Sequence, residues 1–190
     1  MRPLPTSFFR RPAEVVARDL LGATIVSTIG GRSCAGLIVE TEAYLGHDDP
    51  ASHAYLGRRH QGNESIYGPP GIWYVYRSYG VHWCANLVVR GPAGGAAVLL
   101  RAVLPVEGED LMRARRGGVA PSGLANGPGK LTQALGITRA LDGMPMGDSP
   151  VQVGRTTKRP APEILVTPRI GITKARDWPL RFLLRKPPAR

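Results

Sequence analysis

Two carboxylates and a tyrosine alternate along one apolar stretch of the chain. Glu40 and Glu42 are two residues apart, and Tyr44 follows two residues later. Because side chains alternate between the faces of a strand, a strand at Leu37–Leu45 places these three on one face. The other face then carries residues suited to a core: Leu37, Val39, Thr41 and Ala43. The first set suits a catalytic groove, although solvated residues on the outer side of a sheet show the same pattern.

Flat rings gather in the segment that follows this strand, although aromatic residues make up only 6% of the chain. The rings are those of Tyr44, His53, Tyr55, Tyr67, Trp73, Tyr74, Tyr76, Tyr79, His82 and Trp83. Half of them would be core residues in any ordinary fold. The same segment carries Arg58, Arg59, His60 and Arg77. Rings interleaved with guanidinium groups suit stacking on bases and neutralisation of phosphates.

Arg101 follows the apolar run Ala96–Leu100 in what we predict to be a buried strand. A buried guanidinium needs an anionic partner, because an unpaired buried charge is very costly. Glu42 and Glu40 are the natural partners. The pattern leaves open whether such a pair is structural or catalytic.

Tyr79 lies at a predicted hairpin tip, between Ser78 and Gly80. A large ring on a turn either folds back over the sheet or contacts a partner. In a DNA-binding protein, such a ring can act as a wedge that enters the base stack.

Gly127-Pro128-Gly129-Lys130 begins a predicted helix. Free backbone amides and a lysine at a helix start can bind phosphate. The spacing differs from that of a nucleotide P-loop, and simple helix capping explains the pattern equally well.

Periodicity and turn residues predict the elements that position these side chains. We expect a helix that begins at Pro12 and is stopped by Gly22, a hairpin turn at Gly30-Gly31 and a long loop over residues 46–71. The expected strands are Thr24–Ile29, Leu37–Leu45, Ile72–Arg77, Val81–Val89, Ala96–Leu104, Glu163–Val166 and Arg181–Leu184. Further helices are expected at Glu107–Arg116 and Gly127–Leu135. This order predicts an α+β fold: a curved, largely antiparallel sheet with inserted and flanking helices and a protruding β-hairpin.

Composition bounds the class of protein. A chain of 190 residues fits a single compact domain, residues 1–190. The net charge of +11 and the pI near 10.5 favour a polyanionic partner. The apolar runs are too short to span a bilayer, and the N-terminus has no secretory signal, so we expect a cytoplasmic protein, associated with the nucleoid if bacterial. Cys34 and Cys84 are expected as reduced, buried thiols.

Taken in order, these residues resemble the 3-methyladenine (alkyladenine) DNA glycosylase family. The likeness runs from about Leu20 to about Leu183. The matching motifs are Glu40-Thr41-Glu42-Ala43-Tyr44, His53, Tyr74-Val75-Tyr76, Tyr79-Gly80, Cys84-x-Asn86, Leu99-Leu100-Arg101-Ala102 and Gly127-Pro128-x-Lys130-Leu131. The chain departs from the family pattern at Glu64, Tyr67 and Val81.

The resemblance implies a role for each matching residue. Glu42 would activate the hydrolytic water, and Arg101 would help to hold it. The stacking pocket for the flipped base would be formed by Tyr44, His53 and Tyr76, with Asn86 at its floor to discourage guanine. Tyr79 would fill the gap left in the duplex. Charge and position suggest Arg58, Arg59, Arg77 and Lys130 as contacts to the DNA backbone.

The implied reaction is hydrolysis of the N-glycosidic bond of an alkylated purine flipped out of double-stranded DNA. No lysine lies between Glu42 and Tyr79, so water is the expected nucleophile and an abasic site the product. We expect no cofactor and no metal, and a monomer as the default state.

Two other classes remain open at this stage. His47-Asp48-Asp49 matches the His-x-Asp half of an iron-oxygenase site, which would make the chain an oxidative DNA demethylase, with His60 or His82 as third ligand. The other alternative is a non-catalytic basic module that binds DNA or RNA. A zinc deaminase is disfavoured, because the chain has no Pro-Cys-x-x-Cys element.

Overall fold

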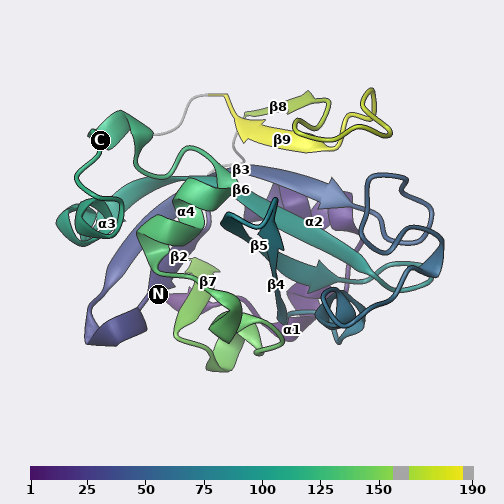
Figure 1. Cartoon of the computed structure of the whole chain (residues 1–190), viewed down its shortest axis with the longest axis horizontal. Helices are drawn as coiled ribbons and strands as arrows, with labels where there is room; N and C mark the ends of the chain where they lie inside the picture. The colour runs from purple at the N-terminus through teal and green to yellow at the C-terminus, as the bar shows by residue number, and fades with distance from the viewer. Residues whose placement is uncertain (156–162, 186–190) are drawn as a thin grey trace.

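The computed structural model describes residues 1–155 and 163–185, whose strands form one curved antiparallel sheet (Figure 1). The main path of the sheet, in spatial order, is β1 (Arg2–Pro3), β7 (Val151–Arg155), β2 (Thr24–Ser27), β3 (Cys34–Tyr44), β6 (Ala96–Glu107), β5 (His82–Val89) and β4 (Trp73–Ser78). Off this path, β9 (Arg181–Leu184) pairs with β3 and with β8 (Ile164–Thr167). The predicted α+β class with a curved, antiparallel sheet is confirmed.

The strand β3 is the centre of the sheet. It pairs with β2 through residues 34–37, with β9 through residues 40–42, and with β6 along most of its length. Strands far apart in the sequence therefore meet around Glu40 and Glu42.

A break in the β3–β6 register changes which residues share a face. Ile38 pairs with Val103 and Thr41 with Leu100, so that Val39 and Arg101 have no direct partner across the ladder. Such a bulge reverses the alternation of side chains along a strand. Ile38 and Ala43 therefore belong to the main core, whereas Leu37 lines a groove on the opposite face of the sheet, with Thr24, Val26 and Ala35. Our expectation that Leu37 and Ala43 share a face is wrong.

Four α-helices lie among the described residues: α1 (Thr6–Phe9), α2 (Ala13–Leu20), α3 (Glu109–Arg115) and α4 (Pro128–Leu135). As predicted, α2 follows Pro12, α4 begins at Pro128, and α4 ends at Gly136, whose φ is +74°. The strand β6 runs to Glu107, so α3 begins two residues later than predicted. No helix in the described part of the chain is long and apolar enough to cross a membrane.

The main core lies between the helices and one face of the sheet. Val16, Ala17 and Leu20 of α2, together with Leu131 and Leu135 of α4, are buried against it. Both cysteines are buried and free, as expected. The hydroxyl of Thr41 donates to the backbone oxygen of Ala17 at 2.9 Å and fastens α2 to β3.

The long segment after β3 is more ordered than predicted. It contains two short 3-10 helices, η2 (Tyr55–Gly57) and η3 (Glu64–Tyr67). Four more are described elsewhere: η1 (Ile29–Gly31), η4 (Pro121–Gly123), η5 (Arg139–Leu141) and η6 (Met146–Asp148). A second apolar cluster joins this segment to the sheet face opposite the main core: Ala54, Ile66, Ile72, Tyr74, Val88 and Ala97.

Sequence analysis missed α1, β1 and β7. The edge strand β7 pairs with β2 and β1, which extends the sheet beyond the first predicted hairpin. Its five residues, Val151–Arg155, alternate too briefly to stand out from the turns around them.

Gly46 joins the end of β3 to the segment before β6 by a close backbone approach. A Cβ there would lie 2.5 Å from the backbone oxygen of Gly94, and the φ of Gly46 is +87°. We predict that Gly46→Ala lowers the free energy of unfolding by clearly more than the about 1–2 kcal/mol that a left-handed backbone costs an L-residue.

The matched control is Gly57→Ala, because Gly57 also has a positive φ, +71°, but has open space around its Cβ position. Thermal unfolding followed by circular dichroism measures both variants; about 1 kcal/mol corresponds to roughly 2–4 °C for a chain of this size. Equal losses in the two variants would show that the backbone contact at Gly46 has no energetic weight.

Candidate active site

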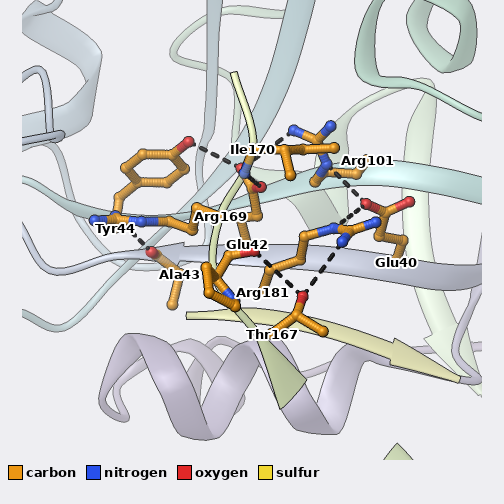
Figure 2. Close-up of polar contacts among 10 residues, drawn as sticks. Glu40, Glu42, Ala43, Tyr44, Arg101, Thr167, Arg169, Ile170 and Arg181 are labelled. Atoms are coloured by element: carbon orange, nitrogen blue, oxygen red, sulfur yellow. Dashed lines mark hydrogen bonds and ion pairs between the residues drawn. The ribbon is translucent and has the colours of Figure 1, made fainter. Parts of the chain in front are cut away.

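Glu42 is completely buried and is held by polar contacts to both carboxylate oxygens (Figure 2). The hydroxyl of Tyr44 donates to Oε2 at 2.9 Å, and Nη1 of Arg101 donates to the same oxygen at 3.2 Å. The backbone N–H of Ile170 donates to Oε1 at 2.9 Å. Glu42 is therefore not one of the solvated residues that the strand pattern also allowed.

Arg101 holds both carboxylates of β3, as the cost of a buried cation predicted. Its Nε lies 2.9 Å from Oε1 of Glu40, which also accepts from Nε of Arg181 at 2.6 Å. Although burial alone would lower the pKa of Arg101, the carboxylates of Glu42 and Glu40 raise it above its usual range. The bulge on β6 is what carries this guanidinium between the two acids.

The segment that follows β8 covers Glu42. Arg169 is wholly buried and makes two hydrogen bonds to the equally buried Asp49. The sequence patterns did not predict Asp49, Arg169, Ile170 and Arg181 as members of this site. Asp49 was assigned only to the His-x-Asp motif of an iron site, and its partner Arg169 is 120 residues away in the sequence.

A cluster of three rings lies on the same sheet face, formed by Tyr74 and Tyr76 of β4 and by His53 of the preceding loop. The ring centroids of His53 and Tyr76 are 4.4 Å apart, edge to face, and those of Tyr74 and Tyr76 are 5.5 Å apart, stacked. These rings border a cleft of about 520 Å³. Its other lining residues are His60, Gly62, Arg77, Trp83 and Arg139.

Not every predicted pocket residue borders this cleft. Tyr44 and Asn86 are not among the described residues that line the cleft. Asn86 is buried, and its Nδ2 donates to the backbone oxygen of Tyr74 at 3.0 Å. Burial raises the pKa of Tyr76, and the nearby Cys84 and Tyr44 raise it further. Tyr44 therefore lies near the ring cluster, although it does not line the cleft.

Tyr79 stands at the tip of the β4–β5 hairpin and is 90% exposed. Tyr79 and Gly80 both have positive φ, +49° and +68°, and the N–H of Val81 donates to the oxygen of Ser78 at 3.0 Å. A two-residue turn of this kind fits the twist of the flanking strands. A left-handed backbone is unfavourable for a non-glycine residue, so the tip holds an exposed ring in a strained conformation.

The chain is similar in sequence to a known family of proteins. A family described as methylpurine-DNA glycosylase (MPG) matches residues 7–188. The chain belongs to this family. A relative from Methanoculleus marisnigri is 51% identical, covering 96% of this chain and 95% of its own; one from Rhodopseudomonas palustris is 50% identical, covering 94% and 82%. Both are named "Putative 3-methyladenine DNA glycosylase".

The four basic residues suggested for the DNA backbone differ in their surroundings in this glycosylase-family chain. Arg77 is exposed, borders the cleft and lies 5.8 Å over the ring of Trp83. Arg58 is exposed beside Tyr55, and Nζ of exposed Lys130 lies 2.9 Å from Oδ1 of Asn126. Arg59 is instead held by Glu64, one of the departures from the family pattern.

Arg59 also lies 4.9 Å over the ring of Tyr67, another departure. A phosphate would have to compete with Glu64 for its guanidinium. Of the four suggested residues, Arg77 is the one that joins a basic side chain to the ring cluster.

The ligand set of an iron oxygenase does not form. Nδ1 of His47 is bonded to Asp48 at 2.7 Å, and the carboxylate of Asp49 is occupied by Arg169 and by the backbone N–H groups of Leu45 and Ala51. Across residues 1–155 and 163–185, no three His, Cys, Asp or Glu side chains gather in a way that could hold a metal ion.

His53 and Tyr74 are joined by a hydrogen bond. Nδ1 of His53 lies 2.7 Å from the hydroxyl oxygen of Tyr74. Burial, followed by the charge of Asp142, raises the pKa of Tyr74, so the phenol keeps its proton. The surrounding protein and then His60 lower the pKa of His53, although part of its side chain is exposed. We therefore predict that Tyr74 is the donor and Nδ1 of a neutral imidazole the acceptor, which places the imidazole proton on Nε2.

We predict that His53 titrates below its ordinary pKa of 6.5 and that Tyr74→Phe raises this value, because the donor that favours the neutral ring is lost. Since the folded pKa is the lower one, the contribution of His53 to stability is complete above pH 6.5 and declines as pH falls below it. An NMR titration of the imidazole signals measures the pKa. Tyr55→Phe, which removes a hydroxyl not bonded to His53, should leave it unchanged. A lower value in Tyr74→Phe would contradict the assigned direction.

Proposed function

We propose that this protein, acting as a single domain and monomer, excises alkylated purines of the 3-methyladenine type from double-stranded DNA. The base is flipped out of the duplex, and a water activated by Glu42 hydrolyses its N-glycosidic bond. The observation that carries the proposal is the buried carboxylate of Glu42, held by Arg101 and Tyr44 on the sheet face that also carries the ring cluster. The matching family supports the same reaction class.

Oε1 of Glu42 has one acceptor position with no described donor. An ionised carboxylate has about four acceptor positions. Tyr44 and Arg101 share Oε2, whereas Oε1 accepts one described donor, the N–H of Ile170. The remaining position on Oε1 can accept the proton of an attacking water. General-base assistance of this kind contributes roughly 10²–10⁴-fold.

The rings supply the means to hold an extrahelical base. Alkylated purines such as 3-methyladenine and 7-methylguanine carry positive charge, and the faces of Tyr44 and Tyr76 attract a cation by about 0.5–2 kcal/mol. His53, hydrogen-bonded to Tyr74, adds a third flat surface. Asn86 is fixed by its bond to the backbone of Tyr74, which suits a fixed role in opposing the exocyclic amino group of guanine.

Water is the nucleophile that fits the chain. No lysine lies between Glu42 and Tyr79. Lys130, which belongs to a matching motif, points its Nζ to Asn126. Because the described residues that contact Glu42 include no lysine, we infer that the product is an abasic site in an uncut strand.

The direct test is to incubate the protein with methylated duplex DNA in the presence of a chelator. Free methylated purine is expected. Demethylation that requires added iron would indicate an oxygenase, and tight binding without product would indicate a binding module.

We predict that Glu42→Gln lowers the single-turnover rate of excision by at least about a hundredfold, the lower end of general-base assistance. Gln is nearly isosteric and keeps one acceptor oxygen, so binding to a duplex with an abasic-site analogue should persist. The matched control is Glu163→Gln, which neutralises an exposed carboxylate paired with Arg185. Excision by Glu42→Gln at the wild-type rate would remove Glu42 from the mechanism.

The second prediction for this reaction concerns Tyr79. Base–aromatic stacking is worth about 1–3 kcal/mol, so Tyr79→Ser should reduce excision from fully paired duplex by roughly ten- to a hundredfold. The deficit should shrink for a mismatched lesion, because an unpaired base flips at lower cost. The melting temperature should barely change, since the side chain is 90% exposed.

Val106→Ser is the control for loss of an exposed apolar side chain, because Val106 is 58% exposed on β6, outside the hairpin. Equal deficits of Tyr79→Ser on paired and mismatched lesions, or unfolding of this variant, would contradict the wedge role.

A further inference from the structure

The ion pair between Arg169 and Asp49 is the most deeply buried one among the described residues, with no side-chain exposure on either partner. Nη1 of Arg169 lies 2.5 Å from Oδ2 of Asp49, and Nη2 lies 2.8 Å from Oδ1. Nη1 also donates to the backbone oxygen of Ala43 at 3.1 Å. The pair thus ties the segment after β8 to the end of β3 and to the loop that follows it.

Two links run from this pair to Glu42. The guanidinium of Arg169 lies 4.7 Å from the centroid of the Tyr44 ring, and the hydroxyl of that ring donates to Oε2 of Glu42. The next residue in the chain, Ile170, donates its backbone N–H to Oε1. Figure 2 shows Arg169 beside Tyr44 and Ile170 close to Glu42. One guanidinium therefore fixes a donor to each oxygen of the carboxylate.

Stability alone does not account for such a pair. Two charges lose their hydration when they are buried, and well-packed apolar residues in their place are often as stable or more so. Asp49 is also held by the N–H groups of Leu45, at 3.1 Å, and Ala51, at 3.0 Å, so the carboxylate has a fixed place in the loop. A rigid bidentate contact is what a positioning role requires.

We propose that Arg169 and Asp49 are positioning residues for excision: their ion pair sets the ring of Tyr44 and the N–H of Ile170 against Glu42. The proposal rests on the proposed function of Glu42 and adds to it. Arg169 covers one face of the Tyr44 ring, which leaves the opposite face for a flipped base. Neither residue acts on the substrate itself; both act through the groups that bind Glu42.

A double-mutant cycle with Glu42 tests this role. Single-turnover excision from duplex DNA containing 7-methylguanine is measured for Arg169→Met, Glu42→Gln and the combination, together with the dissociation constant for an abasic-analogue duplex. Because a misplacement of about 1 Å can cost about a hundredfold in rate, we expect Arg169→Met to slow excision at least about tenfold. The dissociation constant should change less than about threefold.

In the Glu42→Gln background, Arg169→Met should change the residual rate less than about twofold, because residues that act through one group are not additive. Equal losses in both backgrounds would show that the pair is merely structural and would overturn the proposal, as would a wild-type rate in Arg169→Met. The control for loss of an arginine is Arg185→Met, which breaks an exposed ion pair: the side chain of Arg185 is 61% exposed and that of Glu163 is 57% exposed.

Two further measurements cover the case in which Arg169→Met does not fold. Arg169→Lys keeps the charge but not the bidentate contact, and the same cycle and criteria apply to it. In Asp49→Asn, hydrogen exchange at the Ile170 amide should be at least about tenfold faster than in the wild type, because local opening is easier; unchanged exchange overturns the proposal. If the wild type releases no base, the proposed function is wrong. If the wild type excises the base, Glu42→Gln abolishes excision and the Arg169 variants do not slow it, only the positioning role is wrong.

Discussion

The structure depends on one constraint, the burial of an acidic side chain in the middle of a sheet. A carboxylate with no exposure needs donors at both oxygens, because an unpaired buried charge costs several kcal/mol. Glu42 has three such donors, and they come from β3 itself, from a bulge in β6 and from the segment after β8. The bulge in β6 and the segment after β8 interrupt the regular sheet, but they supply two of the donors that stabilise the buried carboxylate of Glu42.

The two faces of the sheet carry different kinds of side chain: one packs into the main core, and the other carries the polar and aromatic groups of the candidate site. On β4 and β5, Trp73, Val75 and Leu87 face the main core, whereas Tyr74 and Asn86 lie on the opposite face. The core face is almost entirely apolar and is covered by α2 and α4. The opposite face carries buried polar side chains, and Glu42, Tyr74 and Asn86 on it each have a described hydrogen-bond partner. Under the proposed reaction, the rings on this face can adapt to a base without disturbing the packing that holds the sheet together.

How much of this could be predicted follows from the range of each interaction. The alternation of Glu40, Glu42 and Tyr44 is a local pattern. The cost of burying a cation was enough to predict that the two glutamates pair with Arg101. The bulge was not predictable, because no residue type marks the unpaired Val39, and the wrong face for Leu37 followed from it. The site residues contributed by the C-terminal segment were missed for a different reason. Their partners are more than a hundred residues away, and only the folded sheet brings β9 beside β3.

The charged side chains around Glu42 balance one another, whereas the excess positive charge lies elsewhere in the chain. Glu40, Glu42 and Asp49 are balanced by Arg101, Arg169 and Arg181, three carboxylates against three guanidiniums, so the site is formally neutral. The net charge of +11 therefore arises elsewhere in the chain. Exposed basic residues such as Arg77 can draw in a phosphate backbone at long range, with the salt dependence typical of such contacts. Under the proposed function, a cationic purine beside Glu42 meets no net charge from these three carboxylates and three guanidiniums, and the electron-rich rings can favour it over an unmodified base. Affinity for DNA and selectivity for the damaged base can in this way be set by different residues of one small sheet.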